Sequence, residues 1–174
     1  MPKKSVRENK NMYQLAREEA GFTRAKASEE TGFLSESVIE KIEYGEKLPD
    51  AEEVLALAVA YKRMDLLNRH CARICPIGKR RVPEVTMSSL SDIVLNMLDS
   101  LNHLEQEKNR LIEITADGVI SEEEMEDFAR IGKLIAKISL VADSMRLWVE
   151  QSGAEGTMNR EELARLMENG DGKR

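Results

Sequence analysis

The chain has 174 residues, which fits one domain of average size or two small ones. Its formal net charge of −6, from 26 Lys and Arg against 32 Asp and Glu, argues against a surface that is basic throughout. The charge is unevenly divided, because residues 1–81 carry net +3 and residues 82–174 carry net −9. Only the first part is electrostatically suited to contact phosphate groups.

The composition predicts an all-α protein. Four Pro and ten Gly mark too few turns for a β-sandwich, and residues that favour helices, such as Leu, Ala, Glu and Lys, are plentiful. No apolar segment approaches the roughly 20 residues that span a bilayer, so we expect no membrane partner. Two Cys favour a reduced, cytoplasmic protein. Catalytic and cofactor motifs are missing from the sequence, so we expect neither an enzyme nor a cofactor.

Four short helices are predicted in the first part of the chain. They span residues 12–20, 24–30, 36–44 and 51–61. Thr23 and Ser35 can cap the second and third helices, and Gly21, Gly32 and Gly45 can end the first three. Apolar residues at helical spacing predict the inward faces. They are Leu15, Ala16, Val38, Ile39, Ile42, Val54, Leu55, Leu57, Ala58 and Tyr61.

This order of elements resembles the lambda-repressor-like helix-turn-helix domain of the XRE (Cro and phage-repressor-like) family. The resemblance covers about 50 residues. Its most specific part is a tail with Ile42-Glu43-Tyr44-Gly45, then Pro49, then Leu55-Ala56-Leu57-Ala58. A Cys-Pro-Ile-Gly segment at residues 75–78 is similar to a linker in helix-turn-helix proteins of Gram-positive bacteria and their mobile elements. The resemblance implies that the second helix braces on the DNA backbone and the third enters the major groove.

The same resemblance implies which residues contact DNA. The bases would be read from the start of the third helix, and cations on neighbouring segments would hold phosphates. The implied DNA-binding residues are Arg24, Lys26, Ser35, Glu36, Ser37, Glu40, Lys41 and Lys47. Further phosphate contacts are expected from Lys3, Lys4, Arg7, Lys10 and Arg17.

Two features depart from the family pattern. Glu36 and Glu40 place negative charge on the reading helix, where each repels phosphate unless it finds a donor. The turn at residues 32–35 is about one residue longer than the usual family spacing. Both features favour an alternative in which the domain is a protein-interaction adaptor without sequence-specific DNA binding.

We expect four segments: a helix-turn-helix domain at 1–66, a connector with Cys and Pro at 67–86, a helical hairpin at 87–151, and a flexible linker, short helix and tail at 152–174. The hairpin is predicted from two apolar stripes around a turn at Asp117-Gly118. The stripes are Met87, Leu90, Val94, Met97, Leu101, Leu104, Lys108 and Leu111, then Phe128, Ile131, Ile135, Ile138, Ala142, Met145 and Val149. Leu134, Val141 and Trp148 widen the second stripe. Since two helices alone leave much apolar surface exposed to solvent, we expect the hairpin to form a homodimer.

Two segments admit a metal but have a structural interpretation that we favour. Cys71 and Cys75, with His70 beside them, supply too few ligands for a closed zinc site, so packing at a junction is favoured over zinc or redox chemistry. Residues 113–124 have calcium-loop spacing but poor ligands at two positions. A turn followed by a Ser121–Glu124 capping box accounts for more of that segment.

The sequence thus predicts an all-α DNA-binding transcriptional regulator with an N-terminal helix-turn-helix domain and a C-terminal long antiparallel hairpin. We expect a dimer that reads a roughly palindromic operator in double-stranded DNA with its third helix.

Overall fold

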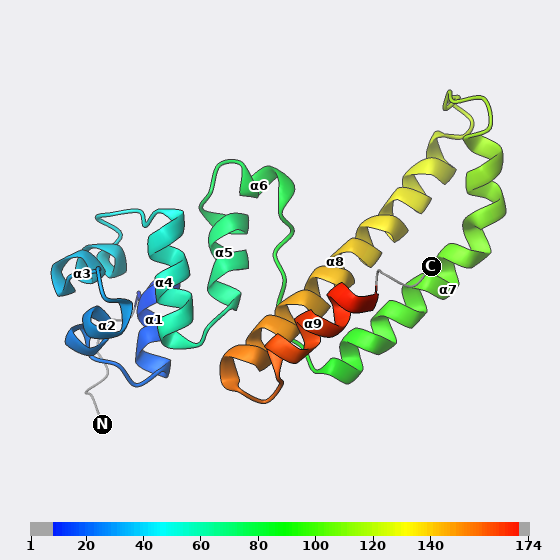
Figure 1. Cartoon of the computed structure of the whole chain (residues 1–174). Coiled ribbons are helices and arrows are strands. Elements are labelled where there is room, and N and C mark those ends of the chain that lie inside the picture. The colour runs from blue at the N-terminus through cyan, green and yellow to red at the C-terminus, as the bar shows by residue number, and fades with distance from the viewer. Residues whose placement is uncertain (1–8, 171–174) are drawn as a thin grey trace. The chain divides into compact units, whose positions relative to one another are not determined.

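The computed structural model describes residues 9–170, which are helical and contain no strand (Figure 1). The helices are α1 (Met12–Glu19), α2 (Arg24–Thr31), α3 (Glu36–Tyr44), α4 (Ala51–Tyr61), α5 (Asp65–Arg73), α6 (Gly78–Arg81), α7 (Leu90–Ile114), α8 (Met125–Glu155) and α9 (Arg160–Gly170). The predicted all-α fold is confirmed. The described residues divide into two units. One contains the chain up to Glu84 and from Val149 onward, and the other is Val85–Trp148.

The first four helices each begin with a side chain that accepts a hydrogen bond from the first turn. These caps are Asn11 to the N–H of Gln14 (3.0 Å), Thr23 to Lys26 (3.1 Å), Ser35 to Val38 (3.3 Å) and Asp50 to Glu53 (2.9 Å). Gly32 and Gly45 end α2 and α3 with φ of 78° and 74°, a backbone conformation that favours glycine. The caps and stops predicted for α2 and α3 are confirmed.

The core of this unit contains most of the predicted apolar residues but not all of them. Leu15 and Leu55 were expected to face inward and are 41% and 51% exposed. In α1 the buried face follows Tyr13, Ala16 and Arg17, a spacing of three and four residues that turns Leu15 toward solvent. The predicted residues that lie in the core are Ala16, Ile39, Ile42, Val54, Leu57, Ala58 and Tyr61.

The segment expected to be a connector contains two helices, so the boundary predicted at residue 67 falls inside α5. Helix α5 packs against α4 and buries Leu66 completely. It is also joined to α1, because the Tyr13 hydroxyl and His70 Nδ1 are 2.7 Å apart. These contacts make α5 part of the N-terminal helical unit.

The end of α8 also differs from the expectation. Residues 152–155 were expected to lie in a flexible linker, and they continue α8 instead. The Gln151 amide nitrogen donates to Lys62 O (2.8 Å), and its oxygen accepts from the N–H of Met64 (3.0 Å). The Lys62 carbonyl and the Met64 N–H lie just after the end of α4, where backbone groups have no hydrogen-bond partner within the helix. These long-range hydrogen bonds outweigh the weak helix propensity of the Ser and Gly residues.

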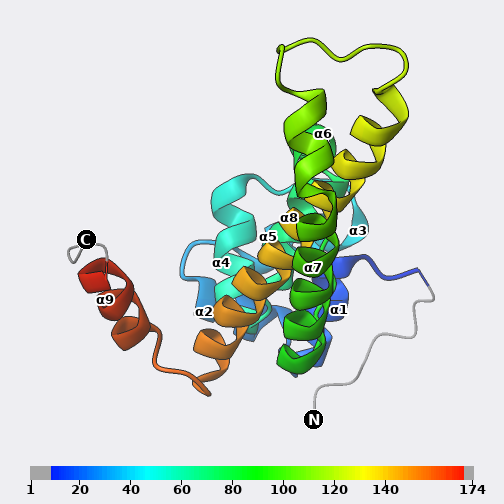
Figure 2. The same ribbon diagram turned by 90° about the vertical axis from the view of Figure 1, so that its right-hand side faces the viewer.

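Helix α7 and the part of α8 up to Trp148 form an antiparallel hairpin in the second unit, and both views show them side by side (Figures 1 and 2). The chain reverses at Gly118, with φ of 75°, after Asp117 Oδ1 accepts from the N–H of Val119 (3.0 Å). Ion pairs also connect the two helices along their length. They join Lys137 to Asp99 (2.8 Å), Arg130 to Glu107, and Arg110 to Asp127 (2.6 Å).

The buried seam of the hairpin is rotated from the predicted stripes. On α7 the fully buried positions are Ile93, Ser100 and Ile114, none of which is in the predicted stripe. On α8 they include Ile131, which was predicted, and Val141, which was placed beside the stripe. Apolar residues cover more than one face of each helix, so periodicity alone could not choose the seam. The predicted residues that stay exposed include Leu90, Val94, Leu101, Phe128 and Ile135, which we call the outer stripe.

Candidate nucleic-acid interface

Helix α3 presents a polar face to solvent and an apolar face to the core. Ile39 and Ile42 are each 1% exposed, which anchors the helix. Glu36, Ser37 and Lys41 lie on its exposed face. The Ser35 hydroxyl serves as the N-cap, so its oxygen already accepts a hydrogen bond from the N–H of Val38. The arrangement leaves the Ser37 hydroxyl and the Lys41 amine available to contact base edges or phosphates, and the Glu36 carboxylate available to accept from a base-edge donor.

Glu40 does not stand alone on this face. Arg24, at the start of α2, donates from Nη1 to Glu40 (2.5 Å) and from Nε to Glu43 (2.9 Å). Its guanidinium also lies 5.1 Å from the centre of the Tyr44 ring. The structure thus brings together two predicted DNA-binding residues, Arg24 and Glu40, as an ion pair. The pairing supplies the donor that Glu40 needs beside phosphate.

Arg17 is not available to phosphate, contrary to the expectation. It donates to both carboxylate oxygens of Glu43, at 2.5 and 3.1 Å, and to Phe22 O at 2.6 Å. Both side chains are buried, so the pair braces α1 against α3. Sequence reasoning missed Glu43 as a core residue. The signal was present, because Glu43 lies four residues after the buried Ile39 and beside Ile42.

Most of the other predicted phosphate contacts are ion-paired within the domain. Lys26 pairs with Glu29 and Glu30 (3.1 and 2.7 Å), Lys47 pairs with Glu53, and Lys10 pairs with Glu18 (2.6 Å). Lys41 is exposed and makes no ion pair with a described residue. The expected contacts Lys3, Lys4 and Arg7 lie outside the described residues. A paired lysine can still meet a phosphate, but its carboxylate partner weakens that attraction.

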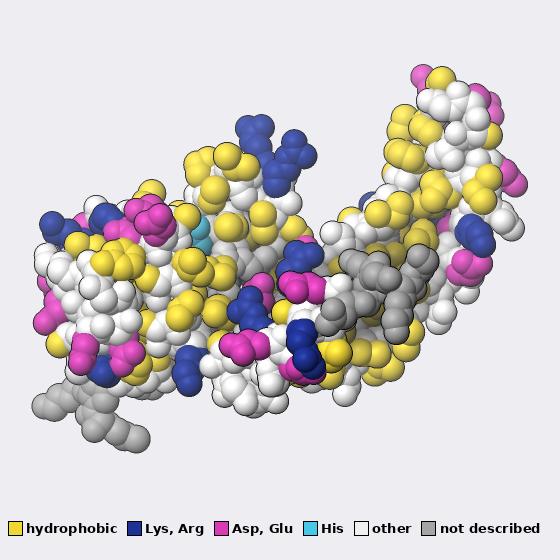
Figure 3. All heavy atoms as spheres, viewed as in Figure 1, with side chains coloured by type: hydrophobic (Ala, Val, Ile, Leu, Met, Phe, Trp, Pro, Cys, Tyr) yellow, Lys and Arg dark blue, Asp and Glu magenta, His cyan; other side chains and the backbone are white. Residues whose placement is uncertain are grey.

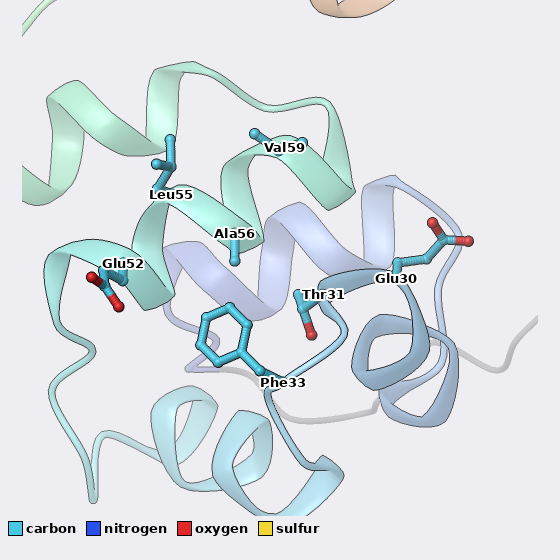
Figure 4. A pocket seen from close by; sticks show the side chains of 7 residues that line it. All are labelled: Glu30, Thr31, Phe33, Glu52, Leu55, Ala56 and Val59. Atoms are coloured by element: carbon cyan, nitrogen blue, oxygen red, sulfur yellow. The ribbon is translucent and has the colours of Figure 1, made fainter.

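The turn between α2 and α3 places its two apolar side chains differently. Leu34 fills the core and is 3% exposed, whereas Phe33 is 62% exposed. Phe33 borders a groove of about 360 Å³ that is also lined by side chains of α2 and α4 (Figure 4). Its lining is apolar with an acidic rim and consists of Glu30, Thr31, Phe33, Glu52, Leu55, Ala56 and Val59.

Neither candidate metal segment gathers a ligand set. No group of three or more His, Cys, Asp or Glu side chains suited to a metal occurs among residues 9–170. In the first segment, Cys75 Sγ accepts a hydrogen bond from the N–H of Gly78 (3.4 Å). Burial lowers the pKa of the neighbouring His70. In the second segment, Glu124 accepts from the hydroxyl (2.7 Å) and the N–H (3.0 Å) of Ser121, and these bonds lower the pKa of the carboxyl.

Comparison with known proteins agrees with this architecture over the N-terminal helices. A family described as "Helix-turn-helix domain" matches residues 14–70, which extend from α1 into α5. Residues 14–70 form a helix-turn-helix domain. No curated protein and no solved structure matches the chain. Among the helices described, none is both long and apolar enough to cross a membrane.

Proposed function

We propose that the protein is a DNA-binding transcriptional regulator of the XRE type that reads its operator with α3. The observation that carries the proposal is the helix-turn-helix domain itself, with Ser37 and Lys41 exposed on the third helix. The Arg24–Glu40 pair supports it, because one of the two acidic residues on the reading helix is compensated. Serine and lysine are suited to contact guanine edges or phosphates.

The helical hairpin provides the dimer interface in this proposal. The outer stripe leaves large apolar side chains 38–48% exposed along both helices. A groove of about 460 Å³ lies on this face. Its lining is mainly apolar, with three polar residues, and consists of Leu101, Asn102, Leu104, Glu105, Lys108, Leu111 and Ile135. Two hairpins that bury this face against each other form a four-helix bundle, which is a stable arrangement for such a pattern.

A two-fold dimer predicts the symmetry of the DNA site. Two reading helices related by a two-fold axis contact half-sites about 34 Å apart, which is one turn of the duplex. The operator is then roughly palindromic. The charges fit this assignment of DNA binding to the first part and dimerisation to the second, since the part with net −9 is repelled by DNA and the part with net +3 is not.

Selection of bound duplexes from a random DNA pool, with the full chain as bait, tests the proposal. We expect a recovered palindrome and an affinity that falls steeply as salt rises. A pool that shows no enrichment, together with binding that is insensitive to salt, would contradict a DNA-reading function.

The match to a helix-turn-helix domain does not favour the alternative, an interaction adaptor, but two features of the surface are compatible with it. Glu36 makes no hydrogen bond or ion pair with a described residue, so its charge faces the DNA side uncompensated. The groove beside Phe33 offers an apolar surface to a protein. Replacing Glu36 and Glu40 with Gln distinguishes the two functions. A regulator gains DNA affinity because both negative charges are lost while Arg24 stays paired with Glu43, whereas an adaptor shows no change at any salt concentration.

A further inference from the structure

Helix α6 carries three consecutive basic side chains, Lys79, Arg80 and Arg81, and all three are exposed. The basic side chains gather over α6 in the space-filling view (Figure 3). This cluster lies outside the reading helix and beyond the segment matched by the helix-turn-helix family, which ends at residue 70. No part of the proposed function uses it so far.

The cluster is held in place on α5. Gly78 is buried so closely against Cys71 that an added Cβ would lie 2.2 Å from the Cys71 carbonyl oxygen. Beyond α6 the chain is tied back to α5, because Asn68 Nδ2 donates to Pro83 O at 2.9 Å. Arg73 also pairs with Glu84 at 2.5 Å. The three cations are therefore presented by a fixed helix rather than by a loose linker.

The cations of α6 differ from most others in their unit. Eight basic residues between residues 9 and 84 are ion-paired: Lys10, Arg17, Arg24, Lys26, Lys47, Arg63, Arg69 and Arg73. Five in that range make no ion pair with a described residue, namely Lys41, Lys62, Lys79, Arg80 and Arg81. Three of these five are consecutive. The cluster thus holds most of the uncompensated positive charge that this described part of the chain can offer to a polyanion.

We infer that Lys79, Arg80 and Arg81 form a second phosphate-binding site, which contacts the DNA backbone at a place separate from the bases that α3 reads. The inference rests on the proposed DNA-binding function. Helix α5 packs on α4 and α6 packs on α5, so the cluster belongs to the same unit as the reading helix. Its contribution is electrostatic and independent of base sequence, since three unpaired cations attract phosphates wherever the duplex passes.

The first experiment measures how DNA affinity depends on salt, with a mixed-sequence duplex of about 40 base pairs as the probe. The full chain is compared with the triple variant Lys79→Gln, Arg80→Gln and Arg81→Gln. We expect the slope of log K against log salt to decrease in magnitude by about 2 to 3, because each lost phosphate contact removes about 0.9. The control removes the same number of positive charges from exposed cations elsewhere, Lys133→Gln, Arg146→Gln and Arg165→Gln, of which the two arginines are ion-paired. We expect it to keep the wild-type slope.

The outcomes separate this inference from the proposed function. A wild-type chain with a steep slope that the α6 variant retains would overturn the inference and leave the regulator intact. A wild-type chain without salt-dependent DNA binding would overturn both. Ile77 beside the cluster is 76% exposed, so vesicles of phosphatidylserine and phosphatidylcholine are included as a second probe. Vesicle binding that the α6 variant loses, with DNA binding unchanged, would assign the cluster to lipid and refute the inference.

A second measurement uses the unaltered protein and so does not depend on how a variant folds. Lysines are acetylated with and without the duplex, and the modified positions are read by mass spectrometry. We expect the duplex to protect Lys79 at least several-fold while leaving the exposed Lys133 unchanged. Equal modification of Lys79 in both samples would refute the backbone contact.

Discussion

At the scale of single residues, the most informative contact is the buried pair of Arg17 and Glu43. Arg17 was expected to hold phosphate, and it instead ties α1 to α3, the proposed reading helix. Removing Arg17 leaves the buried Glu43 carboxylate with Arg24 as its remaining cationic partner, and such a loss of compensation costs more than the ion pair contributes. The role of Arg17 is thus to position α3.

We predict that Arg17→Met lowers the free energy of unfolding by about 3 kcal/mol. Urea unfolding followed by circular dichroism measures the change. Arg146, which is 71% exposed and pairs with Asp143 three residues away, provides the control. Arg146→Met is expected to cost only a few tenths of a kcal/mol. A comparable loss in both variants would show that burial of the Arg17 pair has no special weight.

The contact between Tyr13 and His70 predicts a dependence on pH. Burial lowers the pKa of His70 in the folded protein below its value in the unfolded chain, and the tyrosine hydroxyl lies 2.7 Å from its Nδ1. The unfolded chain therefore binds more protons at mildly acidic pH, so stability is lost as pH falls through about 6.5.

Thermal unfolding between about pH 7 and about pH 5.5 tests this dependence. We expect the wild-type melting temperature to fall with pH in that range, and the fall to be smaller in His70→Gln. The other histidine, His103, is exposed on α7 and serves as the control. If His103→Gln reduced the pH effect as much as His70→Gln did, the assignment to His70 would be wrong.

At the scale of elements, two glycines with different surroundings test how tightly α6 packs against α5. Gly78 sits against the backbone of Cys71, whereas Gly132 in α8 has open space where a Cβ would lie. Added volume in a tight contact forces backbone movement, but alanine in an open helical position reduces the entropy lost on folding.

We predict that Gly78→Ala destabilises the protein by about 2 kcal/mol, because α6 must move away from α5. Gly132→Ala is expected to stabilise it by about 0.5 to 1 kcal/mol. Chemical denaturation of both variants provides the comparison. A neutral Gly78→Ala would mean that the contact with Cys71 is looser than its geometry indicates.

Some boundaries of the helices could be predicted from local sequence patterns, and others could not. Caps and glycine stops depend on residues adjacent in sequence, so Thr23, Ser35 and Gly45 could be assigned correctly from the chain alone. The continuation of α8 through residues 152–155 depends on Gln151 meeting the end of α4. No local pattern contains that contact, because its partners are 89 residues apart in the chain.

At the scale of the whole molecule, the outer stripe of the hairpin makes the proposed dimer testable. Leu101 and Ile135 line one groove and are 45% and 48% exposed. Charge placed there opposes burial against a second copy, since a buried carboxylate without a partner is costly.

We predict that wild-type protein sediments as a dimer and that the double variant Leu101→Glu and Ile135→Glu sediments as a monomer with unchanged helix content. Leu95, which is 65% exposed and lies outside the groove lining, supplies the control. Leu95→Glu should remain dimeric. A monomeric wild-type protein at micromolar concentration would refute the proposed interface.

The sequence by itself determined the helical class, the order of the first four helices and the contrast in charge between the two parts of the chain. These properties follow from composition, local capping and periodicity, all of which act between neighbouring residues. Only the tertiary structure decided which cations remain unpaired and which apolar stripe is buried. Arg17, Arg24 and Lys47 look alike in sequence to Lys79 and Arg80, but the first three meet carboxylates from other segments. Ion pairing and seam selection depend on which side chains the fold brings together, and a one-dimensional pattern does not contain that information.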